Sequence, residues 1–152
     1  MGYTHYWTPN ETLTSEQRKK MVDFTKEAIK LSGVTIKGGN GEGLPTVSKK
    51  SIRFNGNGDS GHSHETFCLL EKSDWWSDCC KTAMKPYDDV VVACLIYADE
   101  IDVIKEWSSD GSLIHGEFNR GLTLYSRVTG VDLEYKYNFM KNLQELDKEF
   151  NV

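Results

Sequence analysis

Residues 51–70 read Ser-Ile-Arg-Phe-Asn-Gly-Asn-Gly-Asp-Ser-Gly-His-Ser-His-Glu-Thr-Phe-Cys-Leu-Leu, and this stretch decides the fold class. Its first four residues alternate polar and apolar side chains as a half-buried strand does, and residues 66–70 form a second strand-like run. The glycine-rich residues 55–65 between them are longer than a tight turn. We therefore expect an antiparallel hairpin with a long polar tip. Exposed loops commonly carry functional groups, so the tip is also a candidate site.

Which side chains of the second strand lie on each face of the hairpin depends on the residue at which this strand begins. Alternation would place His64, Thr66 and Cys68 on one face of the hairpin, with Glu65 and Phe67 on the other. If the strand begins after Glu65, this facing does not hold.

Four segments have the signals of helices. Thr14 and Gln17 have the spacing of a capping box, and Gly33 is placed to end the helix that they begin. Pro86 suits the first turn of a second helix, although its apolar run at residues 90–96 is also compatible with a buried strand. The expected helices cover residues 14–33, 87–100, 117–129 and 138–150.

The other segments have weaker signals. Residues 34–36 and 101–108 are expected as strands, and Ser109-Asp-Gly111 as a turn. Residues 37–45 contain four glycines and are expected as a loop. Residues 74–84 are expected as a turn or short helix.

The N-terminal segment is unusually aromatic. Tyr3, His5 and Tyr6 predict an extended segment in the sheet, with the tyrosine hydroxyls and His5 lining a pocket. Strands and helices do not alternate regularly, so we expect an α+β fold in which a small, mostly antiparallel sheet is covered by helices. Residues 1–134 are expected to form a single domain. Residues 135–152 are expected as an amphipathic helical extension, packed on it or on a partner subunit of a homo-oligomer.

Composition excludes several classes of function. The chain has 152 residues, a formal net charge of −5 and a sequence pI of about 5.4, which disfavours binding to DNA or RNA. No apolar stretch is long enough to span a bilayer, and the N-terminus lacks the pattern of a signal peptide, so we expect no membrane partner and a cytoplasmic protein. The four cysteines are expected to be free thiols, as is usual in the cytosol.

Three motif interpretations of the glycine-rich tip lack a required partner. A P-loop needs a following helix, whereas a strand-like segment follows here. His62 and His64 with Cys79 and Cys80 supply four zinc-type ligands, but adjacent cysteines are not the usual spacing, so the question of a metal stays open. Residues 64–66 have the His-x-Thr form of phosphoesterases that pair two such motifs, and no second copy follows His115.

Two other polar groups are candidates. Lys81 and Lys85 could meet a phosphate or carboxylate, and Tyr87 could stack on a ring, although a helix cap with solvated lysines explains them equally well. Ser109 and Asp110 follow a predicted strand, where they form either a turn alone or a ligand-binding group.

Four segments together resemble a known family. They are Gly2-Tyr-Thr-His-Tyr6, Phe54-Asn-Gly56 with His64-Glu-Thr-Phe67, Cys80-Lys-Thr82 with Lys85-Pro-Tyr-Asp88, and Ser108-Ser-Asp-Gly111. In this order they are similar to a family of small, mostly uncharacterised phage-encoded proteins that also occur in bacterial genomes. The resemblance covers roughly residues 2–134 and implies a phage-linked setting. Small phage proteins with polar-aromatic pockets include inhibitors of bacterial immunity that capture or cleave nucleotide-derived signals.

The leading hypothesis is therefore a protein that binds a nucleotide-like small molecule and sequesters a host immune signal. Tyrosine rings would border the base, while Lys81, His64 and loop amides would face phosphate. Asn55, Ser109 and Asp110 would bond polar edges or ribose hydroxyls. The expected ligand-binding residues are Tyr3, His5, Tyr6, Asn55, His64, Glu65, Thr66, Lys81, Tyr87, Asp88, Ser109 and Asp110.

Two alternatives stay open. In an enzyme that degrades such a signal, His64 would act as general acid or base, Glu65 would orient it, and Lys81 would stabilise negative charge. In an inhibitor of a host protein, residues 138–150 would be the contact surface. No cofactor and no metal are expected.

Overall fold

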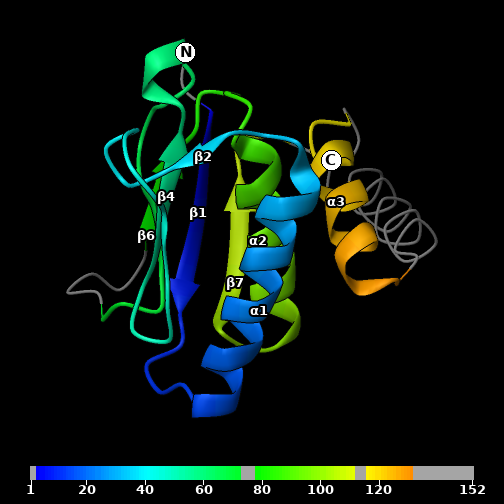
Figure 1. The fold of residues 1–152 in the computed structure, drawn as a ribbon. Helices are drawn as coiled ribbons and strands as arrows, with labels where there is room; N and C mark the ends of the chain where they lie inside the picture. Colours follow the sequence, from blue (N-terminus) through cyan, green and yellow to red (C-terminus); the bar gives the residue numbers. More distant parts are fainter. Residues whose placement is uncertain (1–2, 73–77, 112–115, 132–152) are drawn as a thin grey trace.

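The chain forms two antiparallel sheets and a layer of helices (Figure 1). The computed structural model describes residues 3–72, 78–111 and 116–131. The first sheet has the strand order β6-β1-β7, with β1 at Thr4–Pro9, β6 at Asp78–Lys81 and β7 at Ile104–Ser109. In the second sheet β4 (Ile52–Gly56) pairs with β2 (Ile36–Lys37), β3 (Thr46–Val47) and β5 (Phe67–Leu69). The α+β fold class with antiparallel strands is thus confirmed, with two sheets in place of one.

The predicted hairpin is β4 and β5. Ile52 pairs with Leu69 and Phe54 with Phe67, and both pairs are buried. The tip contains a single turn of 3-10 helix, η1, at Gly58–Ser60. This hairpin forms as expected because its apolar residues recur every second position on one face.

The N-terminal strand β1 lies at the centre of the first sheet. His5 pairs with Cys80 of β6 on one side and with Ser109 of β7 on the other. His5 and Trp7 are buried, whereas Tyr6 between them is 43% exposed. The extended N-terminal segment predicted from its aromatic residues is therefore confirmed, and it alternates as a strand should.

Helix α1 (Ser15–Ser32) has the capping expected from the sequence. Thr14 and Gln17 exchange side-chain and backbone hydrogen bonds, and Gly33 ends the helix in the left-handed conformation at φ 69°. Helix α3 (Asn119–Thr129) ends in the same way at Gly130.

Helix α2 (Asp88–Glu100) is buried on nearly every side, because α1, α3 and β7 all pack against it. The ambiguous run at residues 90–96 is therefore helical. In Figure 1, α1 and α2 lie beside each other next to the first sheet, with α3 on their far side. Among the described residues no helix has the length and apolarity needed to cross a membrane.

Aromatic side chains join the layers. The ring of Phe67 lies 5.3 Å from Trp7 in the first sheet and 5.1 Å from Phe54 in its own sheet, measured between ring centroids. Phe24 of α1 stacks on Tyr97 of α2 at 4.3 Å. Such pairs contribute about 0.5–1.5 kcal/mol each beyond their buried area.

Two expectations about local structure were wrong, and a third was conditional on where a strand begins. Residues 78–81 were expected in a turn or short helix and form β6, because pairing with the distant strand β1 outweighs the local pattern. Pro86 precedes α2, which begins at Asp88. The second hairpin strand begins at Phe67, so the facing predicted for His64 does not hold.

The helix predicted at 138–150 lies outside the described residues, as do residues 73–77 and the extension at 135–152.

Candidate functional site

Asn55 holds the long hairpin tip in place. Its side-chain Nδ2 donates to the carbonyls of Gly39 and His64, both at 3.0 Å, and its Oδ1 accepts from the backbone N–H of Gly56 and His64. With 2% of its surface exposed, this amide has its hydrogen-bonding capacity in use within the protein. Asn55 was predicted to bond a ligand; in the structure it fixes the loop that carries His64.

Thr66 has a similar role at the end of the tip. Its hydroxyl donates to the carbonyl of Gly39. On the other side of the tip, the backbone of His62 packs directly against Gly56. A Cβ built on Gly56 would lie 2.0 Å from the carbonyl oxygen of His62. The tip is therefore a closely packed loop, and His64 and Glu65 are exposed at its surface.

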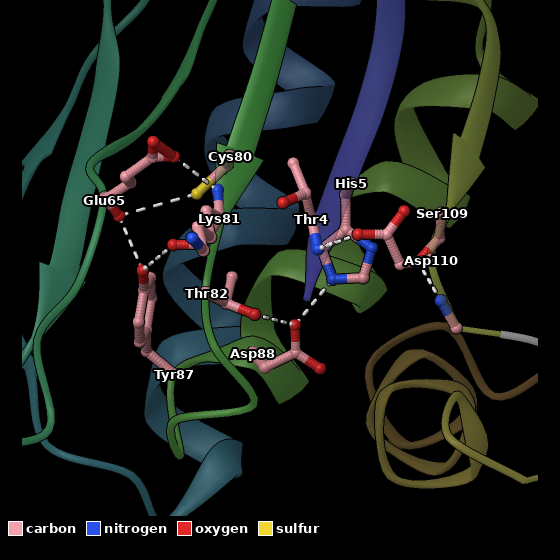
Figure 2. Close-up of polar contacts among 11 residues, drawn as sticks. Thr4, His5, Glu65, Cys80, Lys81, Thr82, Tyr87, Asp88, Ser109 and Asp110 are labelled. Atoms are coloured by element: carbon pink, nitrogen blue, oxygen red, sulfur yellow. Dashed lines mark hydrogen bonds and ion pairs between the residues drawn. The ribbon is translucent and has the colours of Figure 1, made fainter. Parts of the chain in front are cut away.

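Glu65 joins the two sheets to each other (Figure 2). Its backbone N–H donates to the carbonyl of Lys81 at 3.1 Å, and its carboxylate accepts from the N–H of Lys81 at 2.7 Å. The hydroxyl of Tyr87 donates to the carbonyl of Glu65 at 2.6 Å. The backbone of Lys81 and the carboxylate of Glu65 thus stabilise the contact between β6 and the hairpin.

Tyr87 cannot stack on a ligand as predicted, because its side chain is fully buried. Burial raises the pKa of Tyr87 well above its ordinary value, which keeps the phenol neutral and able to donate to Glu65. Tyr3 is 8% exposed, and its pKa is likewise raised, first by burial and then by the Asp88 carboxylate. Of the three tyrosines expected to border a base, Tyr6 is the one that is exposed.

His5 and Asp88 form a buried polar cluster with Thr82. His5 Nε2 lies 2.6 Å from Asp88 Oδ1, and the hydroxyl of Thr82 donates to the same oxygen at 2.6 Å (Figure 2). Asp88 is the first residue of α2, where the helix N-terminus favours a carboxylate. Since His5 is 0% exposed and Asp88 7%, this cluster connects β1 to α2 inside the protein.

Ser109 and Asp110 form the predicted turn and fix the start of β1. The carboxylate of Asp110 accepts from the backbone N–H of Thr4 at 3.1 Å, and its own N–H donates to the carbonyl of Thr4. The hydroxyl of Ser109 accepts from the N–H of Gly111 at 2.9 Å. Gly111 lies directly against the ring of Tyr3, where a Cβ would be 2.4 Å from the tyrosine oxygen.

Several of the predicted residues therefore lie near one end of the first sheet, and the polar groups of Glu65, Tyr87 and Asp88 bond within the protein. Within residues 3–72, 78–111 and 116–131 no group of three or more His, Cys, Asp or Glu side chains is arranged to hold a metal ion. Cys79 is exposed and Cys80 buried, because adjacent residues of β6 face opposite sides. The zinc alternative thus finds no support in the described part of the chain.

A large groove lies elsewhere, between β5 on one side and β1 with β6 on the other; we call it the interstrand groove. Its volume is about 1180 Å³. Thr66 lines it, and the other predicted ligand-binding residues do not. Its buried lining residues are Trp7, Leu69, Leu70, Val103 and Ile104. The Nε1–H of Trp7 is buried and has no hydrogen-bond partner among the described residues.

The net charge of the residues that line this groove differs in sign from the net charge of the whole chain. Four cationic side chains and three carboxylates border it, a difference of +1, whereas the chain carries −5. The cations are Arg18, Arg53, Lys72 and Lys105, and the carboxylates are Glu11, Glu71 and Asp78. Sequence reasoning missed these residues because they come from segments far apart in the chain.

The cysteines provide a test of this geometry. Cys79 is exposed in the groove, Cys68 is half-buried there, and Cys80 and Cys94 are buried. Burial raises the pKa of Cys94 to about 12 and leaves almost no thiolate. We expect a thiol reagent at mildly alkaline pH to modify Cys79 first, then Cys68, with Cys80 and Cys94 reacting only after unfolding. Peptide mapping by mass spectrometry would show this order, and equal rates for Cys79 and Cys94 in the native protein would contradict it.

Comparisons with family models, with curated proteins and with solved structures find no match for this chain.

Proposed function

We propose that the protein binds a small, anionic, nucleotide-like molecule in the interstrand groove and sequesters it. The observation that carries this proposal is the groove itself, whose volume of about 1180 Å³ exceeds the usual range of about 300–1000 Å³ for ligand pockets. The groove has an apolar floor, polar walls and a local excess of positive charge. These features suit a ligand that combines a ring with an anionic group.

Binding is favoured over catalysis by what the polar residues already contact. The Glu65 carboxylate accepts from Lys81 N–H, so it does not orient His64 as the enzyme hypothesis requires. Among the described residues, His5 and Asp88 lie within hydrogen-bonding distance of each other. Both are buried, so this pair does not face a surface groove where it could act on a ligand. In the phage-linked setting that the sequence resemblance implies, capture of the ligand would remove a host immune signal without altering it.

The test is a binding and release experiment. The protein is incubated with cyclic mononucleotides, cyclic dinucleotides, ADP-ribose and cyclic ADP-ribose, separated from free compound, and then denatured. We expect one class of nucleotide to be retained and released with its mass unchanged. A changed mass would instead support the enzyme, and retention of no panel member would contradict both nucleotide hypotheses.

Protection of a thiol locates the bound compound. A nucleotide in the interstrand groove is expected to slow modification of Cys79 at least about tenfold, because this thiol lines the groove. Unfolding by denaturant provides the control, since the denatured protein should react equally with and without the nucleotide. Retention of a nucleotide with no protection of Cys79 would place the site elsewhere.

A further inference from the structure

The interstrand groove separates two strand edges. In the described part of the chain β5 pairs only with β4, and β6 only with β1. One edge of each strand therefore faces the other across the groove. The two edges are connected at one end by the hydrogen bonds between Glu65 and Lys81, so we call this the closed end.

The main-chain direction in β6 shows which backbone groups face the groove. The N–H of Thr82 donates to the carbonyl of Tyr3 and so faces β1, whereas both backbone groups of Lys81 face Glu65. Because alternate residues of a strand point their N–H and C=O groups the same way, Cys79 presents both groups to the groove. An open strand edge of this kind offers a donor beside an acceptor.

The cationic side chains lie toward the other end, which we call the cationic end. Arg18 reaches from α1 to donate to the carbonyl of Leu70 at 3.1 Å, just beyond β5. Lys72 follows along the same segment, and Lys105 is next to Ile104, which pairs with Pro9 at the far end of β1. Arg53, opposite Cys68, is instead paired with Glu71 at 2.9 Å. The groove thus has the exposed main-chain edge of β6 along one wall, and Lys72 and Lys105 near its cationic end.

We propose, on the basis of the proposed function, that this groove binds a nucleoside phosphate in one orientation. The base lies toward the closed end and bonds through its edge to the N–H and C=O of Cys79. The phosphate lies at the cationic end against Lys72 and Lys105. A nucleobase edge carries adjacent donors and acceptors that match a strand edge, and phosphate is bound by charge-assisted hydrogen bonds.

The phosphate end is tested with charge-removing substitutions. The probe is the nucleotide retained in the release experiment, compared with its own nucleoside. The double variant Lys72→Gln/Lys105→Gln is expected to weaken nucleotide binding at least about tenfold and to leave nucleoside binding unchanged. Its nucleotide affinity should also depend less on salt. The matched control is Lys26→Gln/Lys30→Gln on α1, which should bind as the unaltered protein does.

The base end is tested at the Cys79 amide. Hydrogen exchange of this amide is expected to be fast in the free protein and at least about tenfold slower with the nucleoside bound, whereas the neighbouring Cys80 amide faces β1 and should be slow in both. Cys79→Pro removes the N–H at an edge position that tolerates proline and should abolish nucleoside binding, while Cys79→Ala should not. The exchange measurement on the unaltered protein decides the question if the proline variant fails to fold.

The outcomes separate the two proposals. Retention of no nucleotide contradicts the proposed function. Retention with Cys79 thiol protection, but with no effect of the lysine variant and no slowing of the Cys79 amide, contradicts this orientation and leaves the function standing.

Discussion

Replacing Asp88 by alanine is expected to lower the free energy of unfolding by about 3–5 kcal/mol. The substitution leaves the buried His5 imidazole and the Thr82 hydroxyl without their shared acceptor oxygen. It also removes a carboxylate from the N-terminus of α2. Because domains of this size are stable by only about 5–15 kcal/mol, much of the folded-state stability would be lost. Urea unfolding followed by circular dichroism would measure the change.

Two further variants show whether the shared contacts of Asp88 cause this loss. Asp88→Asn keeps an oxygen acceptor for Thr82 and is expected to cost less, about 1–3 kcal/mol. Asp23→Ala removes an exposed carboxylate from α1 and should change stability by no more than about 0.5 kcal/mol. If Asp88→Ala costs no more than Asp23→Ala, the buried cluster does not stabilise the fold.

Gly56→Ala is expected to destabilise the protein by about 3 kcal/mol or more. The added Cβ would lie 2.0 Å from the carbonyl oxygen of His62 and 3.0 Å from the ring of Tyr87. The first contact is with backbone, so no side chain can rotate away to relieve it. Thermal and urea unfolding would measure the loss, and hydrogen exchange should localise it to the hairpin tip.

Gly33→Ala is the matched control for this substitution. Nothing lies within 4 Å of a Cβ at Gly33, so alanine there meets only the backbone cost of its left-handed conformation at φ 69°. That cost is about 1 kcal/mol. A Gly56→Ala loss no larger than that of Gly33→Ala would show that the hairpin tip can move away from β4.

Local structure was predictable where the signal lies within a few neighbouring residues. The Thr14–Gln17 capping box, the helix end at Gly33 and the β4–β5 hairpin depend on short-range hydrogen bonds, backbone conformation and alternation. Strand β6 was missed because the interactions that form it are not local. Its four residues have no strand pattern of their own and are ordered by pairing with a segment more than seventy positions away.

The residues singled out for ligand binding show the same division. Their polarity is plain from the sequence, and the structure does bring several of them together near one end of the first sheet. Residue type alone does not say what a polar group bonds to. The Asn55 amide, the Asp88 carboxylate and the Tyr87 hydroxyl bond to the protein itself, because buried polar groups require partners.

By itself, the sequence determined the antiparallel hairpin at residues 51–70, the capped helix α1, the buried character of α2 and the extended N-terminus. Each of these follows from periodicity or from capping chemistry between near neighbours. Only the tertiary structure decided that β5 and β6 end two separate sheets and leave a groove between them. The physical reason is that Trp7, Cys79 and Lys105 are placed by contacts between distant segments, which no local pattern in the chain encodes.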